Sequence, residues 1–437
     1  MVTPSTPASQ SDPATNDPAT NDPATNETTA EVSPALAPET QTSSDGTETT
    51  SLGQSWLYAG GTLLAIYGLF ASISFLNLGF QSILGPEAEE LLALPANPWL
   101  GLLLGILATA LIQSSSIVTT LLVTLVAGGL PIATAIPMVM GANLGTTITN
   151  TLVSLGYIGD DDSFERGFAA ATIHDCFNLI ALLIFFPLEL LLHLLERLSL
   201  WLLSHSTGLP AIPVGSPVDW LLQPVGGLMA HGINSLSGPW DALLLFGVSV
   251  GGLMVCVTTL GWLLKRWLDA PAQAAIRWVM GRGSSLGLVT GAGVTAMVQS
   301  SSMTTSLAVP LAGSGLVTLT DIYPFVLGAN IGTCITALLA TLPLNSSVAL
   351  QLALVHLAYN LLAVLLIYGL PVLRSLPLTM AKTLAQATRQ YRLVAIAYVI
   401  GMFFVLPFLA LTLSAILMGT HGLEAPTLGV FLPVFHR

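Results

Sequence analysis

The chain has 437 residues, of which 53% are hydrophobic and 8% charged, and its mean hydropathy is +0.78. Soluble domains carry about 25% charged residues, so this composition excludes an ordinary soluble domain and indicates a polytopic membrane protein. The net charge of −12 arises mainly in the first 50 residues, which hold eight of the 23 acidic residues. No basic patch suits nucleic acid, so nucleic acid is not an expected partner.

Residues 1–52 are predicted to form a disordered acidic tail. The pentapeptide Asp-Pro-Ala-Thr-Asn occurs three times in tandem over 12–26, and Ser, Thr, Glu and Pro dominate the residues that follow. Such a segment buries too little apolar surface to offset the loss of chain entropy on folding.

Residues 53–203 are predicted to form a first transmembrane repeat. A helix needs about 20 apolar residues to cross a bilayer. The expected spans are 56–84, 131–157 and 167–187, followed by an interfacial stretch at 188–203. Segment 99–130 is interrupted at its middle by four polar residues. We therefore expect a re-entrant helical hairpin, because irregular backbone at membrane depth is tolerated where it lines a protein cavity.

The same order returns after a Pro- and Gly-rich inter-repeat loop, 204–239. The second repeat, 240–373, is expected to contain spans 240–264, 321–342 and 348–370, an interfacial basic segment at 265–285 and a hairpin at 286–316. Region 374–437 is expected to hold a basic loop (374–392), a last span (393–418) and a C-terminal tail.

Three polar landmarks recur in the same order in both repeats. Gln113-Ser114-Ser115-Ser116 returns as Gln299-Ser300-Ser301-Ser302, and Gly-Ala-Asn-Leu-Gly-Thr at 141–146 returns as Gly-Ala-Asn-Ile-Gly-Thr at 328–333. The third pair is His174 with Asn178, which returns as His356 with Asn360. The fold class that follows is an all-α membrane protein of two repeats plus one extra C-terminal span.

An odd number of spans per repeat requires the two repeats to be inverted relative to each other. With the N-terminus in the cytoplasm, the positive-inside rule is obeyed by nine of the 11 basic residues. These are Arg166, Lys265, Arg266, Arg277, Arg282, Arg374, Lys382, Arg389 and Arg392, against Arg197 and Arg437 outside. The hairpins then enter from opposite faces and meet near the midplane, as in secondary transporters that work by alternating access.

The paired Gln-Ser-Ser-Ser tetrapeptides carry the strongest chemical signal. An unpartnered polar group costs several kcal/mol in hydrocarbon, so two identical polar tetrapeptides favour a shared binding site over simple helix packing. Their amide and hydroxyl donors, with the helix N-termini of broken hairpins, suit an oxyanion. Their carbonyl and hydroxyl oxygens are hard ligands that suit Na+. Further candidate Na+ ligands follow each tetrapeptide within a few residues: Thr119, Thr120, Thr304 and Thr305.

The second landmark has a packing interpretation and a site interpretation. Glycines four residues apart are the small-xxx-small pattern of close helix contacts. That pattern leaves Asn143, Asn330 and the threonines that follow them unexplained, so we expect both asparagines to line the site. His174, Asp175 and His356 are ionisable residues inside spans and are functional suspects by default. They remain candidates for either coupling or helix–helix contacts, as do Asn178 and Asn360.

No catalytic constellation is present, and the tetrapeptide serines have no adjacent base, so an enzyme is not expected. Cofactors other than a coupling ion are not expected either.

The paired Gln-Ser-Ser-Ser segments, each followed about thirty residues later by Gly-Ala-Asn-[Leu/Ile]-Gly-Thr, resemble the sodium-dependent phosphate cotransporter family, the type II family of animals and its bacterial relatives. The resemblance covers about 99–370. It implies phosphate contacts at Gln113, Ser114, Ser115, Gln299, Ser300 and Ser301, to which Asn143 and Asn330 are added. The expected sodium ligands are Ser116, Thr119, Thr120, Ser302, Thr305, Thr333 and Thr336.

The expected function is therefore sodium-coupled symport of inorganic phosphate across the cytoplasmic membrane, with phosphate, sodium ions and the lipid bilayer as partners. One alternative is transport or export of another small anion through the same architecture. A second is a non-transporting membrane sensor or scaffold that holds partners through the acidic tail.

Overall fold

The computed structural model describes residues 52–84, 97–205, 239–279 and 281–420. The described residues form helices and turns without a strand, which confirms the all-α prediction. All of them belong to one compact unit, 51–437. The predictions for the tail (1–51), for most of the inter-repeat loop (206–238) and for the C-terminal end (421–437) lie outside the described residues.

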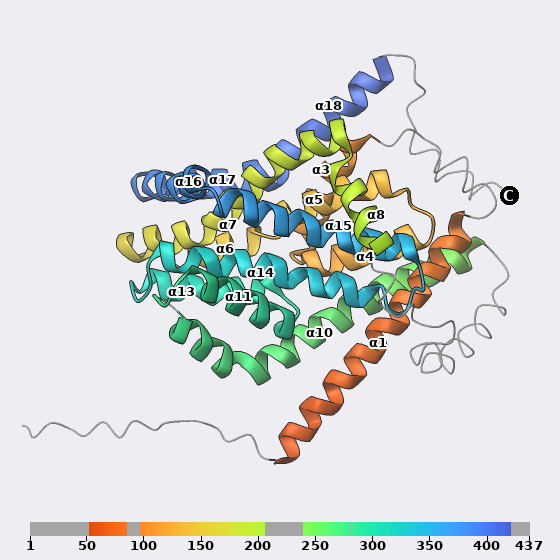
Figure 1. The fold of residues 1–437 in the computed structure, drawn as a ribbon, viewed down its shortest axis with the longest axis horizontal. Coiled ribbons are helices and arrows are strands. Elements are labelled where there is room, and N and C mark those ends of the chain that lie inside the picture. Colours follow the sequence, from red (N-terminus) through yellow and green to blue (C-terminus); the bar gives the residue numbers. More distant parts are fainter. Residues whose placement is uncertain (1–51, 85–96, 206–238, 280, 421–437) are drawn as a thin grey trace, which may run out of the picture. The chain divides into compact units, whose positions relative to one another are not determined.

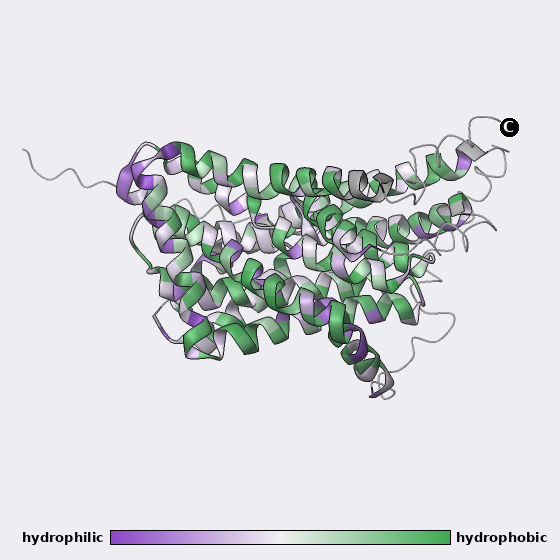
Figure 2. Cartoon of the chain, turned by 90° about the horizontal axis from the view of Figure 1, so that it is seen from above, coloured by the Kyte–Doolittle hydropathy of each residue, from purple (hydrophilic) through white to green (hydrophobic). Residues whose placement is uncertain are grey.

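Seven helical stretches among the described residues are long and apolar enough to cross a membrane, which makes the chain a multi-pass membrane protein. They are Trp56–Ile83, Ile132–Tyr157, Asp161–Leu192, Asp241–Leu264, Leu319–Ala340, Ser347–Tyr368 and Arg392–Leu413. Each of the seven predicted spans coincides with one of them. Figure 2 shows hydrophobic residues along most of the length of the helices and hydrophilic residues gathered near helix ends.

The first half begins with one long helix and continues with two broken ones. Its elements are α1 (Leu52–Leu84), α3 (Pro98–Ile112), α4 (Ser115–Ala127), α5 (Ile132–Gly145), α6 (Ile148–Ser154), the short turn η2 (Leu155–Tyr157), α7 (Asp161–Leu192) and α8 (Leu194–His205). The predicted interruption of 99–130 at the tetrapeptide is confirmed, because α3 ends at Ile112 and α4 begins at Ser115.

The second half follows the same plan. Its elements are α10 (Pro239–Val279), α11 (Ser284–Val298), α12 (Ser301–Ser306), α13 (Ala308–Gly313), α14 (Leu319–Ala340), α15 (Ser347–Ala363) and η3 (Val364–Tyr368). The chain then continues through α16 (Pro371–Gln390), α17 (Arg392–Ile400), η4 (Gly401–Val405) and α18 (Leu406–Thr420).

Helix α10 has 41 residues and continues past the end of the span at Leu264 into the segment predicted to be interfacial, 265–285. One sequence-based assignment is wrong, because the predicted basic loop at 374–392 is helix α16. Pro371 stands in the first turn of α16, where a proline ring favours helical geometry. The buried residues Pro377, Ala381 and Ala385 recur every four residues and form one apolar face, which packs on α7.

The two halves are built on matching helix pairs. In the first half α3 packs along α5, in the second α11 packs along α14, and α1 packs along α10 (Figure 1). Glycines allow the first two contacts to be unusually close. A Cβ added to Gly141 would lie 2.1 Å from the Leu102 carbonyl oxygen, and one added to Gly328 would lie 2.0 Å from that of Leu288. The packing interpretation of the Gly-xxx-Gly motif is therefore confirmed.

An ionic cluster ties the start of α7 to the junction of α16 and α17. Arg389 contacts Asp162 at 3.0 Å and Glu165 at 2.8 Å, and Arg392 pairs with Asp161. Asp160 lies just before the span Asp161–Leu192. Hydrogen bonds from the hydroxyl and the backbone N–H of Ser163 hold the pKa of its carboxyl below the usual value. These partly exposed ion pairs fix local geometry and each adds little stability, about 0–1 kcal/mol.

Candidate functional site

The two tetrapeptides adopt the same backbone conformation in both halves. Gln113 has φ 57° and ψ 27°, and Gln299 has φ 59° and ψ 23°, so both glutamines are left-handed. Each glutamine N–H bonds to a threonine carbonyl four residues earlier, at 2.7 Å in both cases. A left-handed residue ends a helix and is uncommon for a residue other than glycine. The same helix break therefore occurs at the equivalent position of both halves.

The serine after each glutamine starts the next helix as its N-cap. Ser114 and Ser300 are extended, with φ −149° and −152°, and their Oγ atoms accept from the N–H of Ile117 at 3.4 Å and of Met303 at 3.3 Å. A serine Oγ that accepts from the backbone keeps its own proton for another acceptor. Neither Oγ donates to another described residue, so each break presents a hydroxyl that can donate to a ligand.

A cavity of about 250 Å³ lies at the two breaks. The first break contributes Ile112, Gln113, Ser114 and Ile117 to its lining, and Thr149 is added from α6. The second break contributes Gln299, Ser300, Ser302, Met303 and Ser306, and α10 contributes Met254, Val257, Thr258 and Gly261. A water molecule occupies about 30 Å³ of liquid volume, so the cavity has room for a small hydrated anion.

The residues predicted to contact phosphate divide into two groups. Gln113, Ser114, Gln299 and Ser300 line the cavity together, although 186 positions separate the two glutamines. Ser115 and Ser301 are buried just behind it, each 3% exposed, and Ser115 Oγ accepts from Thr146 Oγ1 at 2.9 Å. Asn143 and Asn330, predicted to line the site, are not part of the cavity lining.

The residues predicted to bind sodium lie mainly in the layer behind the cavity. Ser302 lines it, and Ser116 Oγ donates to the Gln299 carbonyl of the other half at 3.3 Å. Thr336 Oγ1 donates to Gln299 Oε1 at 2.9 Å and so orients that amide. The other four are buried threonines. The hydroxyls of Thr119, Thr305 and Thr333 each donate to the backbone carbonyl four residues earlier, and that of Thr305 also bonds to the Asn150 side chain. Thr120 Oγ1 has no partner among the described residues.

A belt of six buried side chains joins the two halves: His174, Asn178, Asn143, His356, Asn360 and Asn330. His174 Nε2 lies 2.6 Å from Asn330 Oδ1, and His356 Nε2 lies 3.0 Å from Asn143 Oδ1. Asn330 Nδ2 donates to Asn178 Oδ1 at 2.8 Å, and Asn143 Nδ2 donates to Asn360 Oδ1 at 3.3 Å.

The bonds of this histidine–asparagine belt are reciprocal. In the first half, His174 and Asn178 both bond to Asn330 of the second half. In the second half, His356 and Asn360 both bond to Asn143 of the first half. Reciprocal contacts of equivalent residues are the pattern of a twofold interface. The geometry favours the helix–helix alternative for these histidines and asparagines.

Asn330→Ala is expected to destabilise the fold, because it removes the hydrogen-bond partner of His174 Nε2 and of Asn178 Oδ1. Leaving a buried polar group unpaired costs about 1–3 kcal/mol. Thermal unfolding in detergent measures the effect, and Asn143→Ala is expected to give a loss of similar size. Asn77→Ala is the control, since Asn77 lies at an exposed contact with Gln81. Equal melting temperatures for all three variants would contradict the role of the belt.

Asp175 is a buried carboxylate outside the belt. Its Oδ2 accepts from Tyr398 of α17 at 2.8 Å and from Thr151 at 3.3 Å, and its Oδ1 has no partner among the described residues. The second half has Leu357 at the equivalent position. Asp175 therefore connects the first half to the last span and breaks the symmetry of the two halves.

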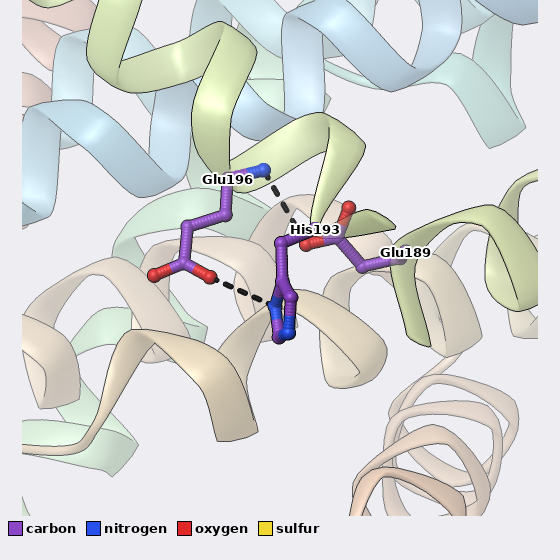
Figure 3. A group of neighbouring side chains, drawn as sticks. All are labelled: Glu189, His193 and Glu196. Carbon is purple, nitrogen blue, oxygen red and sulfur yellow. Dashed lines mark hydrogen bonds and ion pairs between the residues drawn. The ribbon is translucent and has the colours of Figure 1, made fainter. Parts of the chain in front are cut away.

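Glu189, His193 and Glu196 form a group with the residue types of a metal site (Figure 3). The Glu189 carboxylate, however, accepts from the N–H of Leu195 at 2.6 Å and of Glu196 at 3.3 Å, so it caps the start of α8. His193 Nδ1 lies 3.2 Å from Glu196 Oε2. Both Glu189 oxygens are thus engaged, and the group stabilises the turn between α7 and α8.

Sequence reasoning missed two polar residues of the cavity lining, Thr258 and Ser306. Thr149, one of the candidate threonines that follow Asn143, also lines the cavity, and its buried Oγ1 has no partner among the described residues. A further pair of polar residues was missed near the two breaks. Thr109 and Thr295 lie four residues before the two glutamines, and both hydroxyls are buried and without a partner in the described chain. Extending the repeat alignment by four residues would have revealed this last pair, whereas α10 carries no comparable motif.

The fold and the site together define a multi-pass membrane protein with a cavity between two duplicated helix breaks, whose lining combines apolar side chains with amide and hydroxyl groups. A family model described as Na+/Pi-cotransporter matches residues 69–196 and 253–406. The chain belongs to this Na+/Pi-cotransporter family.

Among curated relatives, the chain is 32% identical to "Sodium-dependent phosphate transport protein 2A" of Ovis aries, over 82% of this chain and 68% of the relative. It is 31% identical to "Sodium-dependent phosphate transport protein 2B" of Homo sapiens, over 80% of this chain and 64% of the relative. The chain thus spans about two thirds of the length of these relatives. No solved structure gives a significant match.

Proposed function

We propose that this protein is a secondary active transporter that moves inorganic phosphate with Na+ across the cytoplasmic membrane. One observation carries the proposal. The glutamine and first serine of both duplicated breaks, far apart in the chain, line one cavity. The named activity of the relatives supplies the substrate and the coupling ion.

Phosphate is held by neutral donors in this proposal. Ser114 and Ser300 donate their free hydroxyl protons, and Gln113 adds an amide. The N-terminus of the 13-residue helix α4 adds the positive end of its dipole. Neutral donors bind an anion less tightly than an arginine clamp, and so allow release on the other side of the membrane. Ser115 and Ser301 support the cavity wall from behind.

Sodium ions are held by hard oxygen ligands near the same breaks. We assign this role to the hydroxyl layer of Ser116, Thr119, Thr120, Ser302, Thr305, Thr333 and Thr336. The carbonyl ends of α3 and α11 lie next to this layer, and the C-terminal ends of broken helices suit cations in transporters. Asp175, whose Oδ1 has no partner in the described part of the chain, is a further candidate for coupling.

Charge arithmetic limits the stoichiometry. Moving one charge through 100 mV is worth about 2.3 kcal/mol, so bringing a divalent phosphate into a cell that is negative inside costs about 4.6 kcal/mol. Two Na+ cancel that charge, and three leave one net inward charge that favours uptake.

Alternating access would arise from two inverted repeats, 53–203 and 240–373, whose hairpins enter from opposite faces. The reciprocal belt and the matching helix pairs support a twofold relation between the repeats. The distribution of basic residues supports a cytoplasmic N-terminus. The added span in 374–437 packs beside α3 and, through Tyr398, beside Asp175.

Equilibrium binding of labelled phosphate to the purified protein tests the proposal. Binding is expected in NaCl and is expected to be lost in KCl of equal ionic strength. Binding of another anion with no effect of phosphate would favour the alternative substrate. Absence of binding by every small anion would favour the sensor or scaffold alternative.

A further inference from the structure

Helix α10 forms the third side of the cavity. Met254, Val257, Thr258 and Gly261 line it, at positions i, i+3, i+4 and i+7 of one helix. This spacing places all four residues on one face. The face belongs to neither duplicated motif, so the cavity is asymmetric even though the two breaks are alike.

Four of the hydroxyl groups around the cavity fall into two different hydrogen-bonding states. Thr258 Oγ1 donates to the Met254 carbonyl at 2.6 Å, and Ser306 Oγ donates to the Met303 carbonyl at 2.9 Å. Each of these hydroxyls has its one proton engaged with the backbone, so it offers only lone pairs to a ligand. Ser114 and Ser300 are the opposite case, because their oxygens accept from the backbone and their protons are free.

A ligand that satisfies all four of these hydroxyls must both accept and donate hydrogen bonds. Hydrogen phosphate does so, since its unprotonated oxygens accept and its P–OH group donates. Sulfate carries no proton at neutral pH and can only accept. To contact sulfate favourably, Thr258 or Ser306 would have to give up its bond to the backbone carbonyl.

We propose that Thr258 Oγ1 and Ser306 Oγ share, as acceptors, the hydrogen bond that the P–OH group of the substrate donates, and thereby make the site selective for a protonated oxyanion over sulfate. This inference rests on the proposed function and adds the groups that set its anion selectivity. The serines of the two breaks bind either anion, whereas the α10 face and Ser306 distinguish between them.

The experiment measures binding of labelled inorganic phosphate in NaCl, with unlabelled phosphate or sulfate as competitor. The variants are Thr258→Val, which keeps the side-chain shape, and Ser306→Ala. Loss of one hydrogen bond corresponds to a change of about three- to tenfold in affinity. Because the two acceptors share one donated bond, we expect each variant to lose part of that affinity for phosphate and the double variant to lose all of it, with no loss for sulfate, so the selectivity ratio falls by the same factor.

Two further variants separate this effect from a general disturbance. Thr259→Val changes the neighbouring residue of α10, which is outside the cavity lining, and should keep the wild-type ratio. Thr258→Ser keeps the hydroxyl group and should therefore also keep the wild-type selectivity ratio. Melting temperatures establish that each variant is folded.

The outcomes separate the two proposals. An unchanged selectivity ratio in folded Thr258→Val and Ser306→Ala, with selective wild type, would overturn this inference and leave phosphate transport standing. A wild-type protein that binds no phosphate in NaCl would overturn the proposed function and this inference together.

Discussion

Ser300→Ala is expected to weaken sodium-dependent phosphate binding by about 10- to 100-fold, because a hydrogen bond to a charged group contributes about 1.5–3 kcal/mol. Ser300 lines the cavity, and its hydroxyl proton is free while its oxygen caps α12. Titration of the purified protein with labelled phosphate in NaCl measures the dissociation constant. Ser114→Ala, the equivalent change in the other half, is expected to give a loss of similar size.

Ser346→Ala provides the control for both serine variants. Ser346 caps α15 by accepting from the N–H of Ala349 at 3.3 Å, and it is outside the cavity lining. Its replacement should cost the same capping energy, about 1 kcal/mol, without changing phosphate affinity. Unchanged affinity in both Ser114→Ala and Ser300→Ala would remove these serines from the binding site.

Gly328→Ala is expected to lower the stability of the whole protein. The added Cβ would lie 2.0 Å from the Leu288 carbonyl oxygen and 2.8 Å from the Ala292 nitrogen, so α11 and α14 would have to separate. Overpacking typically costs about 1–3 kcal/mol, and a contact with backbone leaves little room for adjustment. The melting temperature and the yield of monodisperse protein are both expected to fall, as they are for Gly141→Ala.

Gly251→Ala is the matched control, because Gly251 lies in helix α10 and a Cβ there would meet nothing within 4 Å. Alanine favours helix over glycine by about 1 kcal/mol, so this variant should melt no lower than the wild type. If Gly328→Ala and Gly251→Ala melted alike, the close packing of α11 on α14 would not matter for stability.

Local patterns in the sequence predicted the spans and the helix breaks. Runs of about 20 apolar residues located all seven spans, because burial in lipid requires that length. The duplicated tetrapeptide located both breaks to within four residues, because the left-handed glutamine and the N-cap serine that form each break are local features. The sequence of α16 predicts a loop when its basic residues are given more weight than its four-residue apolar period.

Contacts between the halves could not be predicted in the same way. The bonds between His174 and Asn330 and between Ser116 and Gln299 join residues 156 and 183 positions apart. No local pattern in one sequence specifies which distant side chains meet. For the same reason Asn143 and Asn330 were expected at the cavity, whereas their amides bond within the belt, and Thr258 was not considered at all.

Sodium-coupled symport is tested by labelled phosphate uptake into proteoliposomes, with an inward Na+ gradient compared with an equal K+ gradient. We expect strong uptake with Na+ and little with K+, and we expect Ser300→Ala to raise the phosphate concentration needed for half-maximal uptake. Equal uptake under the two gradients, or none under either while sulfate is taken up, would contradict sodium-coupled phosphate symport.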